Sequence, residues 1–271
     1  MPMNKKHYGK WFLTRVKKAS LDFDMIREND RIAVGISGGK DSSALLFIFH
    51  LLKYHLPFDF QVVPIYVDLG FGMDLEPLET FCRDLGFELI TVPTDIREVV
   101  FEVRQEKNPC SLCAKMRKGA LITRAKEMNC NKVAMGHHLD DAIETFFLNL
   151  FYAGKLGSFS PSIYLDRMDI TLIRPMIYLS EDTLISLVRS HGFPVVKNRC
   201  PMDGLTKRQD IKEWMRGLTD TYPDFREKFR NALRNPDLHG IWVPGLTFGQ
   251  SPERKEGENG TGSDDPQRTC I

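Results

Sequence analysis

An apolar run that breaks into a loop of small residues constrains this chain more than any other feature. The run reads Arg31-Ile-Ala-Val-Gly-Ile-Ser-Gly-Gly-Lys-Asp-Ser-Ser43, and a helical pattern follows over residues 42–54. It is apolar enough for a buried parallel strand, and Gly38 and Gly39 allow positive φ and close approach of the backbone to an anion. Free N–H groups at the start of the helix would face that anion. We therefore predict a strand, a phosphate-binding loop and a helix.

The loop is not a Walker A loop. Val34 stands where the first glycine of that motif belongs, and Lys40 is followed by Asp41 rather than by Ser or Thr. The loop instead resembles the PP-loop of the ATP pyrophosphatase superfamily, whose members cleave ATP between the α and β phosphates. An ordinary glycine turn is the alternative. The resemblance implies that ATP is bound by Ser37, Gly38, Gly39, Lys40, Asp41 and Ser42.

Strand and helix patterns alternate along most of the chain. After the first strand, we expect strands over residues 61–67, 87–92, 132–135 and 171–174. We expect helices over residues 42–54, 75–85 and 114–128, one starting after Ser180, and two more over 210–218 and 224–233. This alternation predicts an α/β fold with a doubly wound parallel sheet, to which helices are added at both ends.

The chain divides into three parts by composition. Residues 1–24 read as a basic N-terminal helical segment, 25–248 as the main PP-loop domain, and 249–271 as a disordered tail that cannot bury a core. Residues 1–20 hold six basic and no acidic side chains, and residues 104–132 hold eight basic against two acidic. Such clusters suit a polyanion such as RNA, with solvated helix faces as the alternative. Acids nearly offset a third basic region, formed by Arg216, Arg226, Lys228, Arg230 and Arg234.

The six cysteines indicate the compartment and a metal. No apolar run is long enough for a membrane span or a signal-peptide core, so we expect a cytoplasmic protein with no membrane partner. In such a chain, cysteines favour metal binding or catalysis over a disulfide framework. Cys82 and Cys130 are expected in the core, and Cys270 lies on the tail with no expected role.

Cys110 and Cys113 form a Cys-x-x-Cys pair, a spacing at which two thiolates can converge on one metal. The predicted helix over 114–128 follows directly, and its positive end would favour thiolates. Cys200 comes 90 residues after Cys110, in an extended segment before Pro201. Two buried thiols and a chance third are the alternative.

Acidic residues follow the predicted strand over 132–135 in Gly136-His-His-Leu-Asp-Asp-Ala-Ile-Glu144. Asp140 or Asp141 would start a helix beside the phosphate loop, and Gly136 would lie near the nucleotide. Acids at this end of a parallel strand could hold Mg²⁺ on the ATP phosphates. Helix capping by Asp140 with Glu144 is the alternative.

Three further features lie at predicted strand ends or in loops. Asp68 ends the strand over 61–67 and is a candidate nucleotide contact. Arg174 ends the strand over 171–174, where it could bind a phosphate or pair with an acid. Residues 154–161 form a loop with one lysine, suited to a lid or an RNA contact.

The PP-loop, the Cys-x-x-Cys pair, the Asp-Asp motif and the late cysteine together resemble the TtcA family of tRNA 2-thiocytidine synthetases, over about residues 30–215. The resemblance implies a 4Fe-4S cluster on Cys110, Cys113 and Cys200, with one iron left open for sulfide. Typical bacterial members carry a second Cys-x-x-Cys in the late region, whereas this chain has Cys200-Pro-Met-Asp203. The zinc fingers of related thiouridine synthetases are missing, because neither end has a second cysteine pair.

The same resemblance implies a reaction in two steps. The C2 oxygen of a cytidine in the tRNA anticodon loop attacks the α phosphorus of ATP, and sulfide then displaces AMP from the adenylated base. Lys40 and Arg117 would neutralise developing charge, while Asp41 and Asp141 would hold Mg²⁺. The implied partners are tRNA and a sulfur donor, with a homodimer left open. These four residues form the predicted catalytic set.

Other functions fit parts of the pattern. A lysidine-synthetase-like ligase uses the same ATP chemistry on a tRNA base but has no need of three cysteines. A thiouridine-forming thiolase would share the cysteines and differ in the base. A redox or zinc-binding module with a vestigial ATP site would keep the metal and show no turnover.

Overall fold

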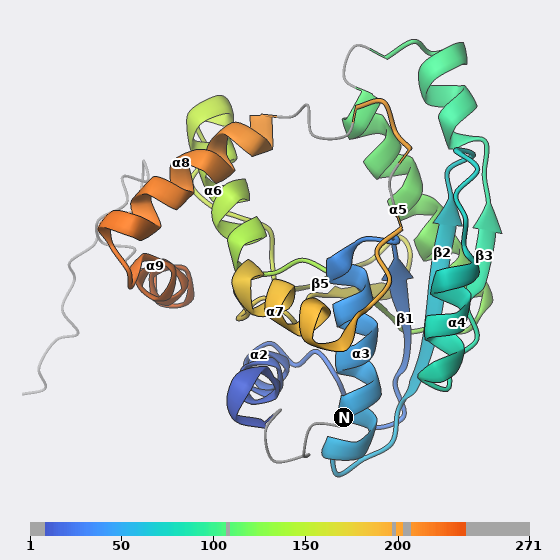
Figure 1. Cartoon of the computed structure of the whole chain (residues 1–271), viewed down its shortest axis with the longest axis horizontal. Coiled ribbons are helices and arrows are strands. Elements are labelled where there is room, and N and C mark those ends of the chain that lie inside the picture. Colours follow the sequence, from blue (N-terminus) through green and yellow to red (C-terminus); the bar gives the residue numbers. More distant parts are fainter. Residues whose placement is uncertain (1–8, 107–108, 197–198, 203–206, 237–271) are drawn as a thin grey trace, which may run out of the picture.

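The computed structural model describes residues 9–106, 109–196, 199–202 and 207–236 (Figure 1). The predicted tail over 249–271, Cys270 and the first eight residues of the N-terminal segment lie outside the described residues.

A six-stranded sheet organises the chain, in the order β3-β2-β1-β4-β6-β5. Five strands run parallel to their neighbours: β1 (Arg31–Ile36), β2 (Gln61–Asp68), β3 (Ile90–Pro93), β4 (Lys132–Ala134) and β6 (Ile170–Ile173). The chain moves outward from β1 to β3 and then crosses to β4 on the other side of β1. The boundary between β1 and β4 is therefore the topological switch point, where ligands of such sheets bind. The predicted doubly wound parallel sheet is confirmed.

One strand was not predicted. β5 (Ser162–Leu165) pairs antiparallel with β6 at the edge of the sheet. Tyr164 and Ile163 are exposed there, so no buried apolar face marks this strand in the sequence. Its pairing with β6, which the sequence pattern does not reveal, defines it as a strand.

Helices cover both faces of the sheet. One face carries α2 (Thr14–Asp22), α3 (Lys40–His55), α4 (Glu76–Asp84) and α7 (Glu181–His191), which share one apolar core with β1. The other face carries the π-helical segment η2 (Glu98–Val103) and α5 (Pro109–Glu127), which form a second core with β2 and β4. Cys82 lies in the first core and Cys130 in the second, as predicted.

The N-terminal segment is part of the first core. The π-helical segment η1 (Gly9–Leu13) leads into α2, and Phe12, Leu13 and Val16 are buried. Lys17 donates to the carbonyl of His55 at 2.7 Å, and Arg15 lies 3.8 Å from Glu227. Lys17 and Arg15 therefore contact the protein itself, whereas Lys5 and Lys6 of the same basic segment lie outside the described residues.

Three helices form a separate group beside the sheet. α6 (Leu139–Ala153) and α8 (Lys207–Thr221) lie side by side, and α9 (Phe225–Arg234) packs against both (Figure 1). Leu139, Ile143, Ile211 and Met215 form their buried core. Within the described residues, no helix is long and apolar enough to cross a membrane.

Candidate functional site

The PP-loop joins β1 to α3 and is held by its own hydrogen bonds. The hydroxyl of Ser42 accepts from the backbone N–H of Ser37 at 3.1 Å and donates to the carbonyl of Gly39 at 2.9 Å. Gly38 has φ of +83°, and its carbonyl accepts from the N–H of Val196 at 2.9 Å. The loop is therefore shaped before a ligand arrives, which lowers the cost of ordering it on binding.

Lys40 is held by two carboxylates. Its Nζ lies 2.9 Å from Oδ2 of Asp41 and 3.0 Å from Oε1 of Glu181, which also accepts from Lys212 at 2.7 Å. Burial acts to lower the pKa of Lys40, but Asp41 and Glu181 raise it overall. Burial acts to raise the pKa of Glu181, but hydrogen bonds from Lys212 and Lys40 lower it to about 2. Lys40 therefore stays positively charged beside the PP-loop.

A cavity of about 560 Å³ lies at the switch point. The PP-loop contributes Ser37, Asp41 and Ser42, and the segment after β4 contributes Gly136 and Asp141. A Cβ on Gly136 would lie 3.4 Å from the backbone of Asp41 and Ser42, so this segment packs closely on the first turn of α3. The remaining wall is apolar at the strand ends and basic on α5; it includes Ile36, Ile65, Val67, Leu121, Lys115, Arg117 and Lys118.

Asp140 and Asp141 are adjacent but differ in their surroundings. Asp141 lines the cavity, where Oδ2 accepts from the N–H of His138 at 3.0 Å. Asp140 is buried, and it accepts from the N–H of Glu181 at 2.8 Å and from Arg226 at 2.6 Å. The alternative of capping by Asp140 with Glu144 is wrong: the helix begins at Leu139, His138 is its N-cap, and Asp141 forms the capping contact.

Arg208 and Glu144 are site residues that the sequence did not reveal. Nη1 of Arg208 lies 3.1 Å from Oδ1 of Asp141 and 3.0 Å from Oε2 of Glu144. Glu144 is buried; burial raises its pKa, and Arg208 opposes that rise. Glu144 follows Asp141 by three residues on one helix, a spacing that places both on one face and could have indicated its role.

A second cavity of about 590 Å³ adjoins the first. Cys110, Cys113 and Cys200 line it, and Ser37 and Arg117 line both cavities. The structure thus brings the three predicted cluster ligands together, although Cys200 is far from the others in sequence. Apolar side chains complete the wall, among them Phe71, Phe101, Val195 and Val196.

One expectation about this pair of cysteines is wrong. α5 begins at Pro109 rather than at residue 114, because proline suits the first turn of a helix, so Cys110 and Cys113 lie in its first two turns. Burial raises the pKa of Cys113, Arg117 opposes this, and Cys200 and Cys110 add to the rise. Burial is the largest of these effects on the pKa of Cys113.

Three thiols that line one cavity fit an iron-sulfur cluster. Among the described residues, no group of three or more Cys, His, Asp or Glu side chains is placed to hold one metal ion. A structural zinc needs four ligands that meet at one point. In an iron-sulfur cluster, each iron takes its own thiolate, so the ligands surround a volume. Three thiols around one cavity fit the ligand arrangement of an iron-sulfur cluster.

Not every predicted residue reaches a cavity. Asp68 ends β2, but it accepts from the N–H of Gly70 at 3.0 Å and lines neither cavity. The basic cluster over residues 104–132 contains both paired and exposed side chains. Lys132 is buried and lies 2.7 Å from Asp30, and Lys126 pairs with Asp169. Exposed basic residues remain at the cavity wall on α5, namely Lys115, Arg117 and Lys118.

The fold and the loop at its switch point define a PP-loop protein. A family profile described as the PP-loop domain matches residues 11–215. Within this class, the chain belongs to the tRNA-cytidine(32) 2-sulfurtransferase family. It is 40% identical over 224 residues to that protein of Pelobacter propionicus, across 81% of this chain and 83% of the relative. It is 37% identical over 237 residues to that of Citrifermentans bemidjiense, across 86% and 93%. The resemblance inferred from the motifs is confirmed.

A solved structure has a similar fold. It is the U34-tRNA thiolase NcsA from Methanococcus maripaludis, described with its 4Fe-4S cluster. The TM-score is 0.69 at 23% identity, across 85% of this chain and 78% of that chain. The architecture of the sheet and its flanking helices is therefore shared.

Proposed function

We propose that this protein is an ATP-dependent tRNA sulfurtransferase that replaces the C2 oxygen of an anticodon-loop cytidine with sulfur. Its family membership supports this function. The observation that carries the proposal is that the cavity at the PP-loop and the cavity of the three cysteines share Ser37 and Arg117. An activated base in the first cavity would be within reach of a sulfur in the second.

The first step activates the base. The cytidine C2 oxygen attacks the α phosphorus of ATP, and the bond from that phosphorus to the bridging oxygen breaks, which releases pyrophosphate. Ser37, Gly39 and Ser42 would hold the pyrophosphate with the start of α3. Lys40 and Arg117 would stabilise the negative charge that develops on the phosphates. Mg²⁺ would be held by Asp41 and Asp141, which line the same cavity.

The second step exchanges oxygen for sulfur. A 4Fe-4S cluster on Cys110, Cys113 and Cys200 would supply an open iron at which sulfide can be held. A carbon-sulfur bond forms at C2 and the carbon-oxygen bond breaks, so that AMP leaves with the former base oxygen. Cytidine, sulfide and ATP therefore become 2-thiocytidine, AMP and pyrophosphate without a net redox change. Arg117, which lines both cavities, is placed to stabilise the leaving phosphate.

The substrate RNA would meet the basic wall on α5. Three exposed basic residues line the 560 Å³ cavity at the PP-loop, which we call the ATP cavity: Lys115, Arg117 and Lys118. They would pair with RNA phosphates. A sulfur donor, a homodimer and a cytoplasmic location belong to the same proposal. The sulfur donor follows from the thiolation chemistry and the cytoplasmic location from the use of tRNA, while the homodimer stays a prediction; each is open to direct measurement.

One assay tests the function. Anaerobically prepared protein is incubated with MgATP, sulfide, lysine and bulk tRNA, and the nucleosides are analysed by mass spectrometry. We expect 2-thiocytidine and one AMP per sulfur. Gain of sulfur on uridine would correct the base, and gain of lysine would indicate a lysidine-synthetase-like ligase. No change on any base, with the cluster retained, would leave only the redox or zinc-binding module.

A further inference from the structure

Arg174 follows β6 at the wall of the ATP cavity and has no carboxylate partner among the described residues. Its Nη1 donates to the carbonyl of Ser160, and its guanidinium lies 4.7 Å from the ring centre of Phe159. Its Nε is buried without a hydrogen-bond partner in the described part of the chain. Burial lowers the pKa of Arg174, and no neighbouring acid offsets this effect.

His137 lines the same cavity from the segment after β4. Its Nδ1 is buried and finds no partner within the described ranges, and its ring centre lies 5.0 Å from that of Phe159. Burial lowers the pKa of His137 to about 4, so the ring is neutral near pH 7 and one of its nitrogens can donate. Two unsatisfied polar side chains therefore contact the same aromatic ring at one wall.

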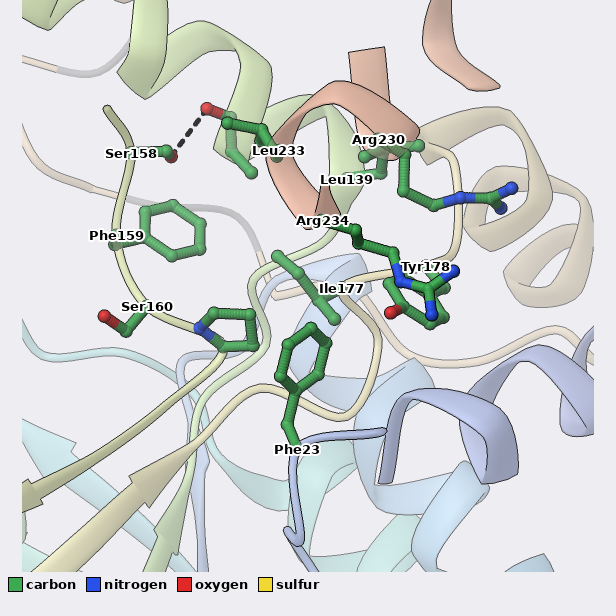
Figure 2. Close-up of a pocket in the computed structure, with 12 residues that line it drawn as sticks. Phe23, Leu139, Ser158, Phe159, Ser160, Ile177, Tyr178, Arg230, Leu233 and Arg234 are labelled. Atoms are coloured by element: carbon green, nitrogen blue, oxygen red, sulfur yellow. Dashed lines mark hydrogen bonds between the residues drawn. The ribbon is translucent and has the colours of Figure 1, made fainter. Parts of the chain in front are cut away.

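A desolvated cation without a counter-ion is costly unless a ligand supplies the negative charge. The ligand would not come from the other side of Phe159. That side lines a separate cavity of about 240 Å³, where Phe159 lies opposite Ile177 and Phe23 (Figure 2). That cavity has cations of its own, Arg230 and Arg234, and Arg174 lines the ATP cavity but not that one. The unpaired charge of Arg174 is thus available to the ATP cavity.

The position of Arg174 separates it from the PP-loop. Ala134 of β4 pairs with Val34 of β1 on one side and with Ile173 of β6 on the other. Arg174 therefore stands two strands away from the PP-loop strand, which is about 10 Å across the sheet. A phosphate at Arg174 is a different group from the pyrophosphate on the PP-loop.

We propose that Arg174 and His137 form a second phosphate-binding subsite, on the wall of the ATP cavity across β4 from the PP-loop. The group bound there is either the α phosphate of ATP or the backbone phosphate beside the target cytidine. This inference rests on the proposed function for the identity of these two ligands. The subsite itself rests on the two unsatisfied side chains.

Binding to the full-length protein tests the subsite without catalysis. The probes are a non-hydrolysable ATP analogue with Mg²⁺ and, separately, bulk tRNA without nucleotide. Arg174→Gln keeps a donor for Ser160 and removes the charge, and Arg174→Lys keeps the charge. Arg83→Gln is the matched control, because Arg83 is exposed on α4. We expect Arg174→Gln to weaken one probe at least tenfold, Arg174→Lys to weaken it less, and Arg83→Gln to change neither.

The two probes separate the two sources of phosphate. Loss for the ATP analogue alone assigns the α phosphate. Loss for tRNA alone, with a salt dependence smaller by about one phosphate contact, assigns the RNA backbone. Unchanged affinity for both probes in Arg174→Gln would overturn the subsite, even where the wild-type protein thiolates tRNA. Wild-type protein that binds both probes but thiolates no base would instead contradict the proposed function.

Thermal unfolding separates a ligand site from a structural role. Without ligand, we expect Arg174→Gln to melt at or above the temperature of the wild type, because a partly buried charge without an acidic partner is removed. The ATP analogue or tRNA should then raise its melting temperature less than that of the wild type. An unliganded variant that melts several degrees lower, or does not fold, would show that Arg174 is a structural residue and would contradict the proposal.

Discussion

Arg208 donates a hydrogen bond from Nη1 to Oδ1 of Asp141 at 3.1 Å. A cation from α8 thereby contacts an acid at the wall of the ATP cavity. The same nitrogen lies 3.0 Å from the buried Glu144. Because α8 follows the segment that carries Cys200, this contact ties the late cysteine region to the acids beside the ATP cavity.

Removal of Arg208 should destabilise the protein through Glu144. We expect Arg208→Gln to lower the free energy of unfolding by about 1–3 kcal/mol, since a buried carboxylate loses its partner. The double variant Arg208→Gln with Glu144→Gln should recover at least half of this loss. Urea unfolding of the single and double variants measures the coupling. A single variant as stable as the wild type would show that the pair is too exposed to contribute.

The adjacent acids should respond differently to the same substitution. We expect Asp141→Asn to lower the thiolation rate at least a hundredfold, because it lines the ATP cavity and is a proposed Mg²⁺ ligand, with little change in stability. Asp140→Asn should instead cost about 2 kcal/mol of stability, because Asp140 is buried against Arg226 and the start of α7. Rates over a Mg²⁺ titration and urea unfolding distinguish the two. If the two variants lost thiolation rate and stability to the same extent, Asp141 would have only a structural role, like Asp140.

Alanine substitutions at two glycines with positive φ, Gly38 and Gly86, can distinguish the effect of backbone strain from an effect on ligand binding. A Cβ on Gly38 would lie 3.3 Å from Cβ of Val196, whereas a Cβ on Gly86 would meet nothing within 4 Å. We expect each alanine substitution to cost about 1 kcal/mol through strain. Only Gly38→Ala should also weaken binding of a non-hydrolysable ATP analogue, by about tenfold. Calorimetric titration measures this, and equal affinities for both variants would remove Gly38 from the phosphate site.

The three cysteines at the second cavity should be needed for the cluster. After anaerobic reconstitution, we expect Cys110→Ala, Cys113→Ala and Cys200→Ala each to lose the visible absorbance of the cluster. Cys82→Ala is the control, because Cys82 is fully buried in the first core. It should keep the absorbance and lose about 1 kcal/mol of stability. Full absorbance in the Cys200 variant would exclude it as a ligand.

Tyr178 should make stability depend on high pH. Its hydroxyl donates to Asp22 at 2.8 Å, and burial together with this contact raises the pKa of Tyr178 to about 12. The phenol of the unfolded chain titrates near pH 10. The contribution of Tyr178 is therefore complete below pH 10 and is lost as the pH rises towards 12.

The variant Tyr178→Phe measures this contribution. It should cost about 1 kcal/mol at pH 8, where the hydrogen bond to Asp22 is intact. The difference from the wild type should shrink between pH 10 and 12. Urea unfolding at several pH values follows it, and a difference that stays constant through this range would contradict the raised pKa.

Local sequence patterns were enough to predict the helices and strands that bury a continuous apolar face. The strand, loop and helix from Arg31 to His55 formed as expected, because an apolar run and a helical period mark them in the sequence. β5 was not predicted, because its exposed side chains carry no such pattern. The start of α5 was placed five residues late, at 114 rather than 109, because the helical pattern was taken to begin after the Cys-x-x-Cys pair, although Pro109 is suited to a first helical turn.

The sequence by itself determined the PP-loop, the parallel sheet and the edge of that sheet where the cysteines and acids gather. It did so because the carboxyl ends of parallel strands must meet at one edge. Only the tertiary structure decided which acid lines the cavity, and that Arg208 contacts it while Arg174 has no acid. These outcomes depend on partners brought together from distant parts of the chain, as with Arg226 and Asp140, and no local pattern encodes such a pair.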